Sequence, residues 1–324
     1  MTTTTTQTMS KTLNALRRAE EVGRAGEPLT DLPRWRSERG FRLVSISSNE
    51  GGVGKTTVAA NLAVYLRALR EADPVLVLGF DDQTTIDRMF ALESGAPTSG
   101  GDLATGLRER SLRGVVRFGQ YGVDYVPSSR DVPELRSLVA GRADLQRVLL
   151  ESRRTGTVVI DTKSDFEVLT KSSILSSDLA IVIVKDQASL IEATRVFDLL
   201  EENGRPRSAA RILLSLVDLR VKFREGEAED VLGHLLGEIR RSDYPVLETF
   251  LSRSPKVESL YTNPDGRAHA ILQGASQSVV HRQMLQLTRE VDVVLQQPVR
   301  RPVASGYANR SPFSLDRLAF RGSS

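Results

Sequence analysis

The chain has 324 residues, of which 40% are hydrophobic and 26% charged, as expected for one large globular domain with arms or for two small domains. It contains no cysteine, which excludes disulfides, thiol catalysis and cysteine-ligated metals, and its three histidines lack metal-ligand spacing. No apolar run is long enough to span a membrane, and the N-terminus lacks the apolar core of a secretory signal. We therefore expect a cytoplasmic protein.

The net charge of +3 is unevenly distributed along the chain. Residues 1–42 carry +3 and residues 297–324 carry +4, which leaves −4 for the body between them. Basic arms on a mildly acidic body favour contact with a polyanion, either nucleic acid or an anionic membrane, although a solvated tail would have the same composition.

Residues 1–40 are predicted to form an N-terminal arm, with a threonine run, a short helix from Ser10 to Val22 and a proline-containing linker. The compact part begins with an apolar strand at Phe41–Ile46. A glycine-rich turn follows, and the spacing of apolar residues then predicts a helix over Thr56–Leu69. We place the domain at 41–296 and a basic, disordered tail at 297–324.

Apolar strands alternate with helices through the rest of the domain. The predicted strands are 74–80, 115–118, 123–126, 157–161, 179–184, 211–217 and a short final one at 246–251. The predicted helices are 84–92, 132–140, 143–152, 189–202, 227–240 and 276–295. This alternation predicts an α/β fold, a doubly wound and mostly parallel sheet covered on both faces, with flexible N- and C-terminal arms.

The strand, turn and helix around Lys55 have the pattern of a phosphate-binding loop. Glycines let successive backbone N–H groups point at one anion, and the helix N-terminus adds free donors and partial positive charge. Lys55 can reach the terminal phosphates, and the Thr56 hydroxyl can bind Mg²⁺. The predicted nucleotide-binding residues are Gly51, Gly52, Val53, Gly54, Lys55, Thr56 and Thr57.

Acidic residues follow three of the predicted strands, at Asp81, Asp161 and Asp218. Ligands of parallel α/β sheets bind at the carboxyl ends of the strands, so these residues are expected on the same edge as the loop. Asp161 is the candidate to hold Mg²⁺, directly or through water, and Asp81 to orient an attacking water. Either carboxylate could instead be a helix cap or a surface residue.

Three segments resemble the ParA/MinD family of ATPases. Residues 50–63 are similar to its deviant Walker A motif, down to the trailing Asn61-Leu62-Ala63, while 75–83 resemble its second motif and 159–162 its Walker B strand. The resemblance implies a P-loop ATPase that binds ATP and Mg²⁺ and hydrolyses ATP slowly. It also implies an ATP-dependent homodimer on a matrix, nonspecific DNA (favoured) or an anionic membrane. It further implies a partner protein that stimulates hydrolysis. The expected role is to position or partition a cargo, in association with the nucleoid or membrane.

The chain departs from that family at several positions. Glu50 stands where the family has a lysine that reaches across the dimer, and Asn49 replaces the usual first glycine of the loop. Gly79 replaces the first aspartate of the second motif, and Lys163 and Ser164 replace two prolines after the Walker B aspartate. These departures leave three alternatives open. The protein could hydrolyse ATP weakly, it could be a nucleotide-gated scaffold, or another residue such as Lys163 could replace the lysine that reaches across the dimer.

Three basic regions are candidates for contact with the matrix. The first follows the strand that ends near Asp218, and the second is the arginine-containing tail at 312–321. The third is Arg267, which falls where the family has a basic residue implicated in DNA binding. The DNA or membrane candidates are Arg220, Lys222, Arg224 and Arg267. Because aromatic residues are scarce, DNA binding would depend on phosphate contacts and therefore on salt.

A fainter similarity concerns residues 9–20. They resemble the lead-in of bacterial tyrosine kinases of polysaccharide export, which implies a kinase relative as an alternative function. Those kinases have a tyrosine-rich tail, whereas this tail contains only Tyr307.

Overall fold

A computed structural model describes residues 35–297, with residues 37, 82–83, 93–99, 130, 219–230 and 265 left out. The predicted helix near the N-terminus, the C-terminal tail and the basic residues Arg220, Lys222 and Arg224 lie outside the described residues. The division into arm, domain and tail stays a prediction.

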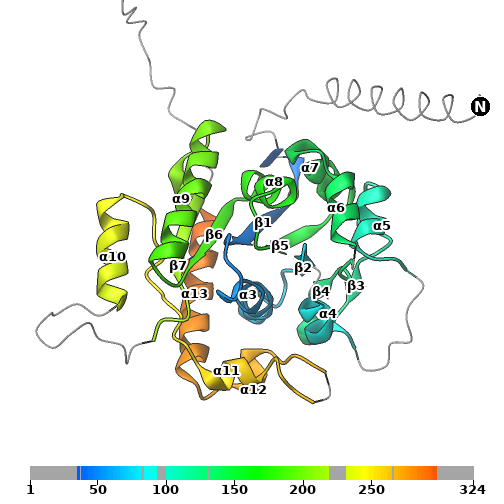
Figure 1. Ribbon diagram of the computed structural model, residues 1–324. Coiled ribbons are helices and arrows are strands. Elements are labelled where there is room, and N and C mark those ends of the chain that lie inside the picture. The colour runs from blue at the N-terminus through cyan, green and yellow to red at the C-terminus, as the bar shows by residue number, and fades with distance from the viewer. Residues whose placement is uncertain are drawn as a thin grey trace, which may run out of the picture.

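A seven-stranded sheet runs through the middle of the molecule in the order β3-β4-β2-β5-β1-β6-β7 (Figure 1). The pairings of β1, β2, β4, β5, β6 and β7 are parallel, and β3 pairs with β4 in the antiparallel sense. The strands are β1 (Gly40–Ser47), β2 (Val75–Gly79), β3 (Arg117–Phe118), β4 (Asp124–Tyr125), β5 (Thr155–Asp161), β6 (Leu179–Val184) and β7 (Ala210–Leu214).

Helices cover both faces of this sheet (Figure 1). One face packs against α3 (Lys55–Leu69), α4 (Thr85–Phe90), α11 (Pro255–Ser259), α12 (Ile271–Gly274) and α13 (Val279–Gln296). The other face packs against α5 (Leu103–Arg108), α6 (Val132–Leu138), α7 (Arg142–Glu151), α8 (Val168–Ser176), α9 (Gln187–Glu202) and α10 (Val231–Arg241). Two 3₁₀ turns, η1 (Gln120–Gly122) and η2 (Arg207–Ala209), complete the described elements.

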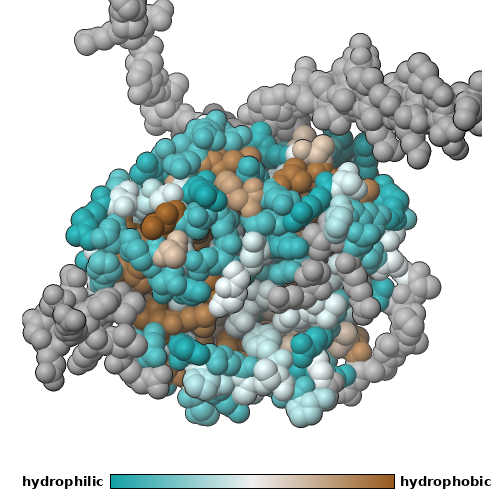
Figure 2. Space-filling view, in the orientation of Figure 1, coloured by the Kyte–Doolittle hydropathy of each residue, from teal (hydrophilic) through white to brown (hydrophobic). Residues whose placement is uncertain are grey.

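The alternation of side chains along β1 shows why the central strands are apolar throughout. Val44 and Ile46 pack into the cluster on the α3 side, whereas Leu43 belongs to the cluster on the α7 side. Successive side chains of a strand point to opposite faces, so a strand covered on both faces needs apolar residues at every position. The outer surface in the view of Figure 2 is mostly hydrophilic, with hydrophobic residues in separate patches.

The predicted fold class is confirmed, because the mostly parallel sheet has helices on both faces. The final strand predicted at 246–251 is wrong: Val246 makes one isolated bridge, with Ile212, and a second isolated bridge joins Val217 to Ser252, just past the predicted strand. The strands predicted at 115–118 and 123–126 shrink to two residues each. Helices α5, α8, α11 and α12 were not predicted. Helix α8 is rich in serine and buries most of its circumference, so it lacks an amphipathic stripe.

Aromatic and basic side chains pack at the amino edge of the sheet, where the parallel strands begin. Trp35 is 1% exposed, and its indole Nε1 donates to the carbonyl of Ser176 at 2.9 Å, at the C-terminus of α8. Arg39 pairs with the Asp178 carboxylate, which also accepts from the backbone N–H of Leu43 at 2.8 Å. The described part of the predicted linker therefore packs against the domain.

None of the helices in the described residues combines the length and the apolar character needed to cross a membrane.

Candidate functional site

The loop between β1 and α3 has the backbone of an anion-binding turn. Gly52 and Gly54 have positive φ values of 70° and 94°, which favour glycine, and Gly54 is the N-cap residue of α3. Gly51 and Gly52 are exposed, whereas Val53 is fully buried and anchors the loop in the core. The loop thus presents backbone N–H groups and the first turn of α3 at the carboxyl edge of the sheet.

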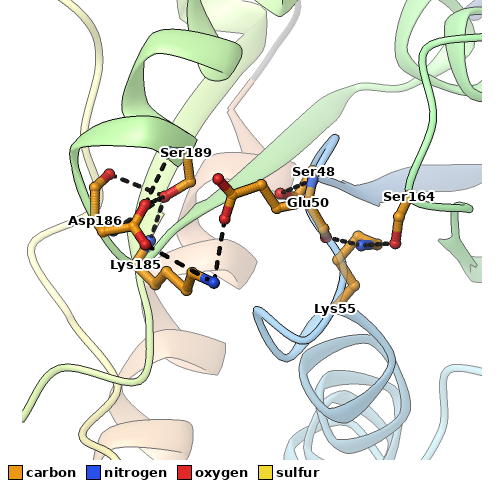
Figure 3. A network of polar contacts seen from close by, with 7 residues as sticks. All are labelled: Ser48, Glu50, Lys55, Ser164, Lys185, Asp186 and Ser189. Atoms are coloured by element: carbon orange, nitrogen blue, oxygen red, sulfur yellow. Dashed lines mark hydrogen bonds and ion pairs between the residues drawn. The ribbon is translucent and has the colours of Figure 1, made fainter.

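Lys55 folds back over this loop. Its Nζ donates to the Glu50 carbonyl at 2.7 Å and to the Ser164 Oγ at 2.6 Å, and the residue is only 6% exposed (Figure 3). Burial lowers the pKa of Lys55, and the nearby carboxylates, Asp161 foremost and then Asp81, oppose that shift. An ammonium with three donors and two acceptors retains a donor for a further partner.

Asp161 lies at the end of β5, beside β1 and β2 in the sheet register, and is 1% exposed. Its carboxylate is hydrogen-bonded to the Thr56 side chain, while its Oδ1 is buried with no partner. Burial raises the pKa of Asp161 to about 7, against the opposing effects of Thr56 and Lys55. A hydroxyl and a carboxylate with a free oxygen are ligands that Mg²⁺ accepts, so these two residues fit the predicted metal-binding role.

Asp81 also lies in this site. It comes two residues after β2, and its charge acts on both Lys55 and Asp161. Gly79 pairs with Asp161 in the register of β2 and β5. A Cβ atom added at Gly79 would lie 3.2 Å from Ile86 Cγ1, so Ile86 occupies the space that a larger residue there would need.

Glu50 turns its carboxylate away from Lys55. Its Oε2 lies 3.2 Å from the Nζ of Lys185, which follows β6, while its backbone carbonyl faces Lys55 (Figure 3). Lys185 Nζ also lies 3.8 Å from Oδ2 of Asp186, the N-cap residue of α9. The neighbouring Asn49 donates from Nδ2 to Glu192 Oε2 at 3.0 Å, also in α9.

Thr57 and Asn61 tie α3 to the C-terminal part of the domain. The fully buried Asn61 donates to the Thr57 carbonyl and to the Tyr261 hydroxyl, each at 2.8 Å, and its Oδ1 accepts from the Ile271 N–H at 2.7 Å. Tyr261 also hydrogen-bonds the Thr57 side chain, and burial raises its pKa to about 12. The asparagine after the loop therefore has a structural role.

A mostly apolar pocket lies next to the loop, on the side of Thr57. It measures about 470 Å³, open solvent at its mouth included. Its walls come from the start of α3, the segment after β7, and the helices α11 to α13, and they include Gly54, Thr57, Leu216, Val257, Tyr261 and Met284.

The structure brings most of the predicted site residues together at the carboxyl edge: the loop 51–57, Asp81 and Asp161. Arg267 lies elsewhere, in the loop between α11 and α12, where its carbonyl accepts from Asn263 Nδ2 at 3.2 Å. Sequence reasoning had not given Lys185 a place in the site, nor assigned Ser164 and Tyr261 their contacts. Lys185 directly follows a buried strand, a signal that would have placed it on this edge.

Comparisons with known proteins agree with this geometry. The AAA domain family matches residues 41–200. The chromosome partitioning protein ParA of Caulobacter vibrioides is 26% identical over 207 residues, which cover 60% of this chain and 76% of that relative.

Solved structures of low identity share the fold. The MinC:MinD cell division complex of Aquifex aeolicus aligns with a TM-score of 0.59 at 18% identity, over 80% of this chain and 99% of that chain. An ATP complex of McdA from Cyanothece aligns with a TM-score of 0.59 at 17% identity, over 81% and 100%. These structures show that the chain has the fold of the ParA/MinD P-loop ATPases, and the AAA domain match and the likeness to ParA, with the phosphate-binding loop and Asp161 described above, support a relation to that family.

Proposed function

We propose that the chain binds ATP with Mg²⁺ at residues 51–57 and hydrolyses it. The observation that carries the proposal is the arrangement of two buried, incompletely paired groups at one loop: the Lys55 ammonium, and the Asp161 carboxylate beside Thr56. Backbone N–H groups of the loop would hold the β-phosphate, and Lys55 would neutralise the terminal phosphates.

Thr56 and Asp161 would hold Mg²⁺, which neutralises charge on the β- and γ-phosphates when bound. Among the described residues, no group of three or more histidine, aspartate or glutamate side chains could hold a metal. The cation would therefore take its remaining ligands from water and phosphate. Asp81, whose charge acts on both Lys55 and Asp161, would orient the attacking water.

The apolar pocket beside Thr57 is our candidate site for the base. A nucleotide whose phosphates lie in the loop extends past the start of α3, and the pocket opens next to Gly54 and Thr57 there. Its apolar lining suits a flat ring system, and the Tyr261 hydroxyl holds Thr57 in place.

We further propose that nucleotide-dependent dimers bind nonspecific DNA, or else an anionic membrane, and so partition or position a cargo. A partner protein would stimulate a slow hydrolysis, and the protein would act in the cytoplasm, at the nucleoid or membrane. The support is the chromosome partitioning and cell division roles in the names of the proteins it resembles. Arg267, together with Arg220, Lys222 and Arg224, is proposed to contact the matrix.

The test is phosphate release, with and without DNA or anionic liposomes, for the wild type, Lys55→Ala and Asp81→Ala. Both variants should lose hydrolysis, and Lys55→Ala should also lose ATP binding. Lys171→Ala, which removes a lysine from α8 whose Nζ lies over the Phe166 ring, is the matched control and should behave as wild type. A wild type that binds no ATP would contradict the proposal.

A second candidate function is a nucleotide-gated scaffold with little hydrolysis. Two observations favour it: Glu50 pairs with Lys185 of its own chain, and Ile86 occupies the space where the family has a carboxylate at position 79. Single-turnover and multiple-turnover experiments decide between the two, since a scaffold would bind ATP tightly but would not complete repeated turnovers.

A further inference from the structure

Two unusual residues of the loop, Asn49 and Glu50, meet the same neighbouring segment. Asn49 contacts Glu192 in α9, and Glu50 contacts Lys185 at the end of β6. Strands β1 and β6 are paired in parallel, so the loop after one and the segment after the other meet at the carboxyl edge. The side chains of Asn49 and Glu50 thus connect the loop to α9 and to the segment just before it.

The Glu50 carboxylate would oppose the function proposed for this loop. The backbone carbonyl of Glu50 accepts from Lys55, so its side chain starts directly beside the phosphate-binding loop. Phosphate groups carry negative charge, and a carboxylate free to swing toward them would weaken their binding. Glu50 is partly buried, with its side chain 24% exposed, so solvent screens that charge incompletely.

Lys185 is placed to prevent this. Its ammonium is 3.2 Å from Glu50 and farther, 3.8 Å, from Asp186. Asp186 is committed to capping α9, where its side chain accepts from the Ser189 N–H at 2.9 Å (Figure 3). Glu50 is therefore the closer acidic partner of Lys185.

We propose that Lys185 is a positioning residue of the phosphate site. It cancels the charge of Glu50 and holds that carboxylate on the α9 side of the loop, so that the inner side can accept an anion. The inference rests on the proposed nucleotide binding and adds the residue that makes Glu50 compatible with it.

The test is a double-mutant cycle on the affinity for a fluorescent Mg²⁺–ADP analogue, using wild type, Lys185→Ala, Glu50→Gln and the double variant. Lys185→Ala should bind about tenfold or more weakly, because the carboxylate is left unpaired. Glu50→Gln and the double variant should bind within about threefold of wild type, since a neutral side chain at position 50 needs no cation. Lys171→Ala is the control for loss of a lysine.

A second readout separates charge from structure. The loss in Lys185→Ala should shrink as KCl is raised from about 0.05 to 0.5 M, whereas a packing defect would not respond to salt. Normal binding by Lys185→Ala, or a weak double variant, would overturn the inference while the proposed function stands; the second result would mean that Lys185 contacts phosphate itself. A wild type that binds no nucleotide would overturn both.

Discussion

The two edges of the sheet bury charge in different ways. At the amino edge, the Arg205 guanidinium is 3% exposed and donates to the carbonyls of Ile174, Leu175 and Ser177 at 2.7, 2.9 and 2.6 Å. At the carboxyl edge, Asp161 is equally buried, yet one of its oxygens has no partner.

The difference separates a structural group from a ligand-binding one. Burying a charge is unfavourable unless hydrogen bonds and opposite charges replace water. Arg205 obtains hydrogen bonds from carbonyls at the end of α8, which also attract a cation. Asp161 obtains only part of them from the protein, and we propose that a bound ligand supplies the rest. Substitutions at the amino edge should therefore lower the stability of the fold, whereas substitutions at the carboxyl edge should weaken ligand binding.

The largest expected effect is at the amino edge. Arg205→Ala leaves three carbonyls without their donor and should lower the free energy of unfolding by about 3–5 kcal/mol. Urea denaturation measures this, and Arg113→Ala, which removes an exposed arginine, is the matched control that should leave the midpoint unchanged. Equal urea midpoints for the two variants would contradict the structural role assigned to Arg205.

Trp35→Ala should cost nearly as much, about 3–5 kcal/mol, because it removes a fully buried aromatic ring that packs edge-on against Phe41 at 6.0 Å between ring centroids. Nucleotide affinity should not change. Phe118→Ala, a 67% exposed aromatic, is the control and should stay within about 0.5 kcal/mol of wild type. If Trp35→Ala left the free energy of unfolding unchanged, residues 35–40 would be a linker and not part of the packed domain.

Asp161→Asn should stabilise the ligand-free protein above pH 7, by about 4 kcal/mol. The pKa of about 7 lies above the ordinary value of 3.8, so the folded state keeps a proton that the unfolded chain releases. Stability of the wild type therefore falls as pH rises from about 4 to 7, and the variant should lack this fall. Thermal unfolding from pH 4 to 8 measures it, with the exposed Asp198→Asn as control; parallel curves would contradict the assignment.

The smallest expected effect is at position 79. Gly79→Asp restores the residue type of the family, but its Cβ would lie 3.2 Å from Ile86 and 3.5 Å from Ser128 Oγ. We expect a loss of about 1–2 kcal/mol and no gain in hydrolysis. The same substitution at Gly141, the N-cap of α7 with no atom within 4 Å of an added Cβ, should be neutral or stabilising. Faster hydrolysis by Gly79→Asp would show that the missing carboxylate limits the rate.

The sequence predicted the carboxyl edge better than the amino edge for a physical reason. The apolar strands, the glycine turn and Asp161 are local patterns, and parallel topology alone collects their ends on one edge. The contacts of Arg205 with α8, of Lys55 with Ser164 and of Glu50 with Lys185 join segments far apart in the chain. The strand wrongly predicted at 246–251 also depended on a pairing between distant segments: its apolar pattern is local, but only Val246 forms a bridge with β7, to Ile212.

The central claim is that Asp161 is completed by a cation delivered with the nucleotide. Calorimetric titration of the wild type with a non-hydrolysable Mg²⁺–ATP analogue, at pH 7 in buffers of different ionisation enthalpy, measures protons released on binding. With a pKa of about 7, Asp161 is about half protonated at that pH and must lose its proton to hold Mg²⁺. We predict release of roughly half a proton by the wild type, and weaker binding without that release by Asp161→Asn. Equal affinity and equal proton release in both proteins would contradict the claim.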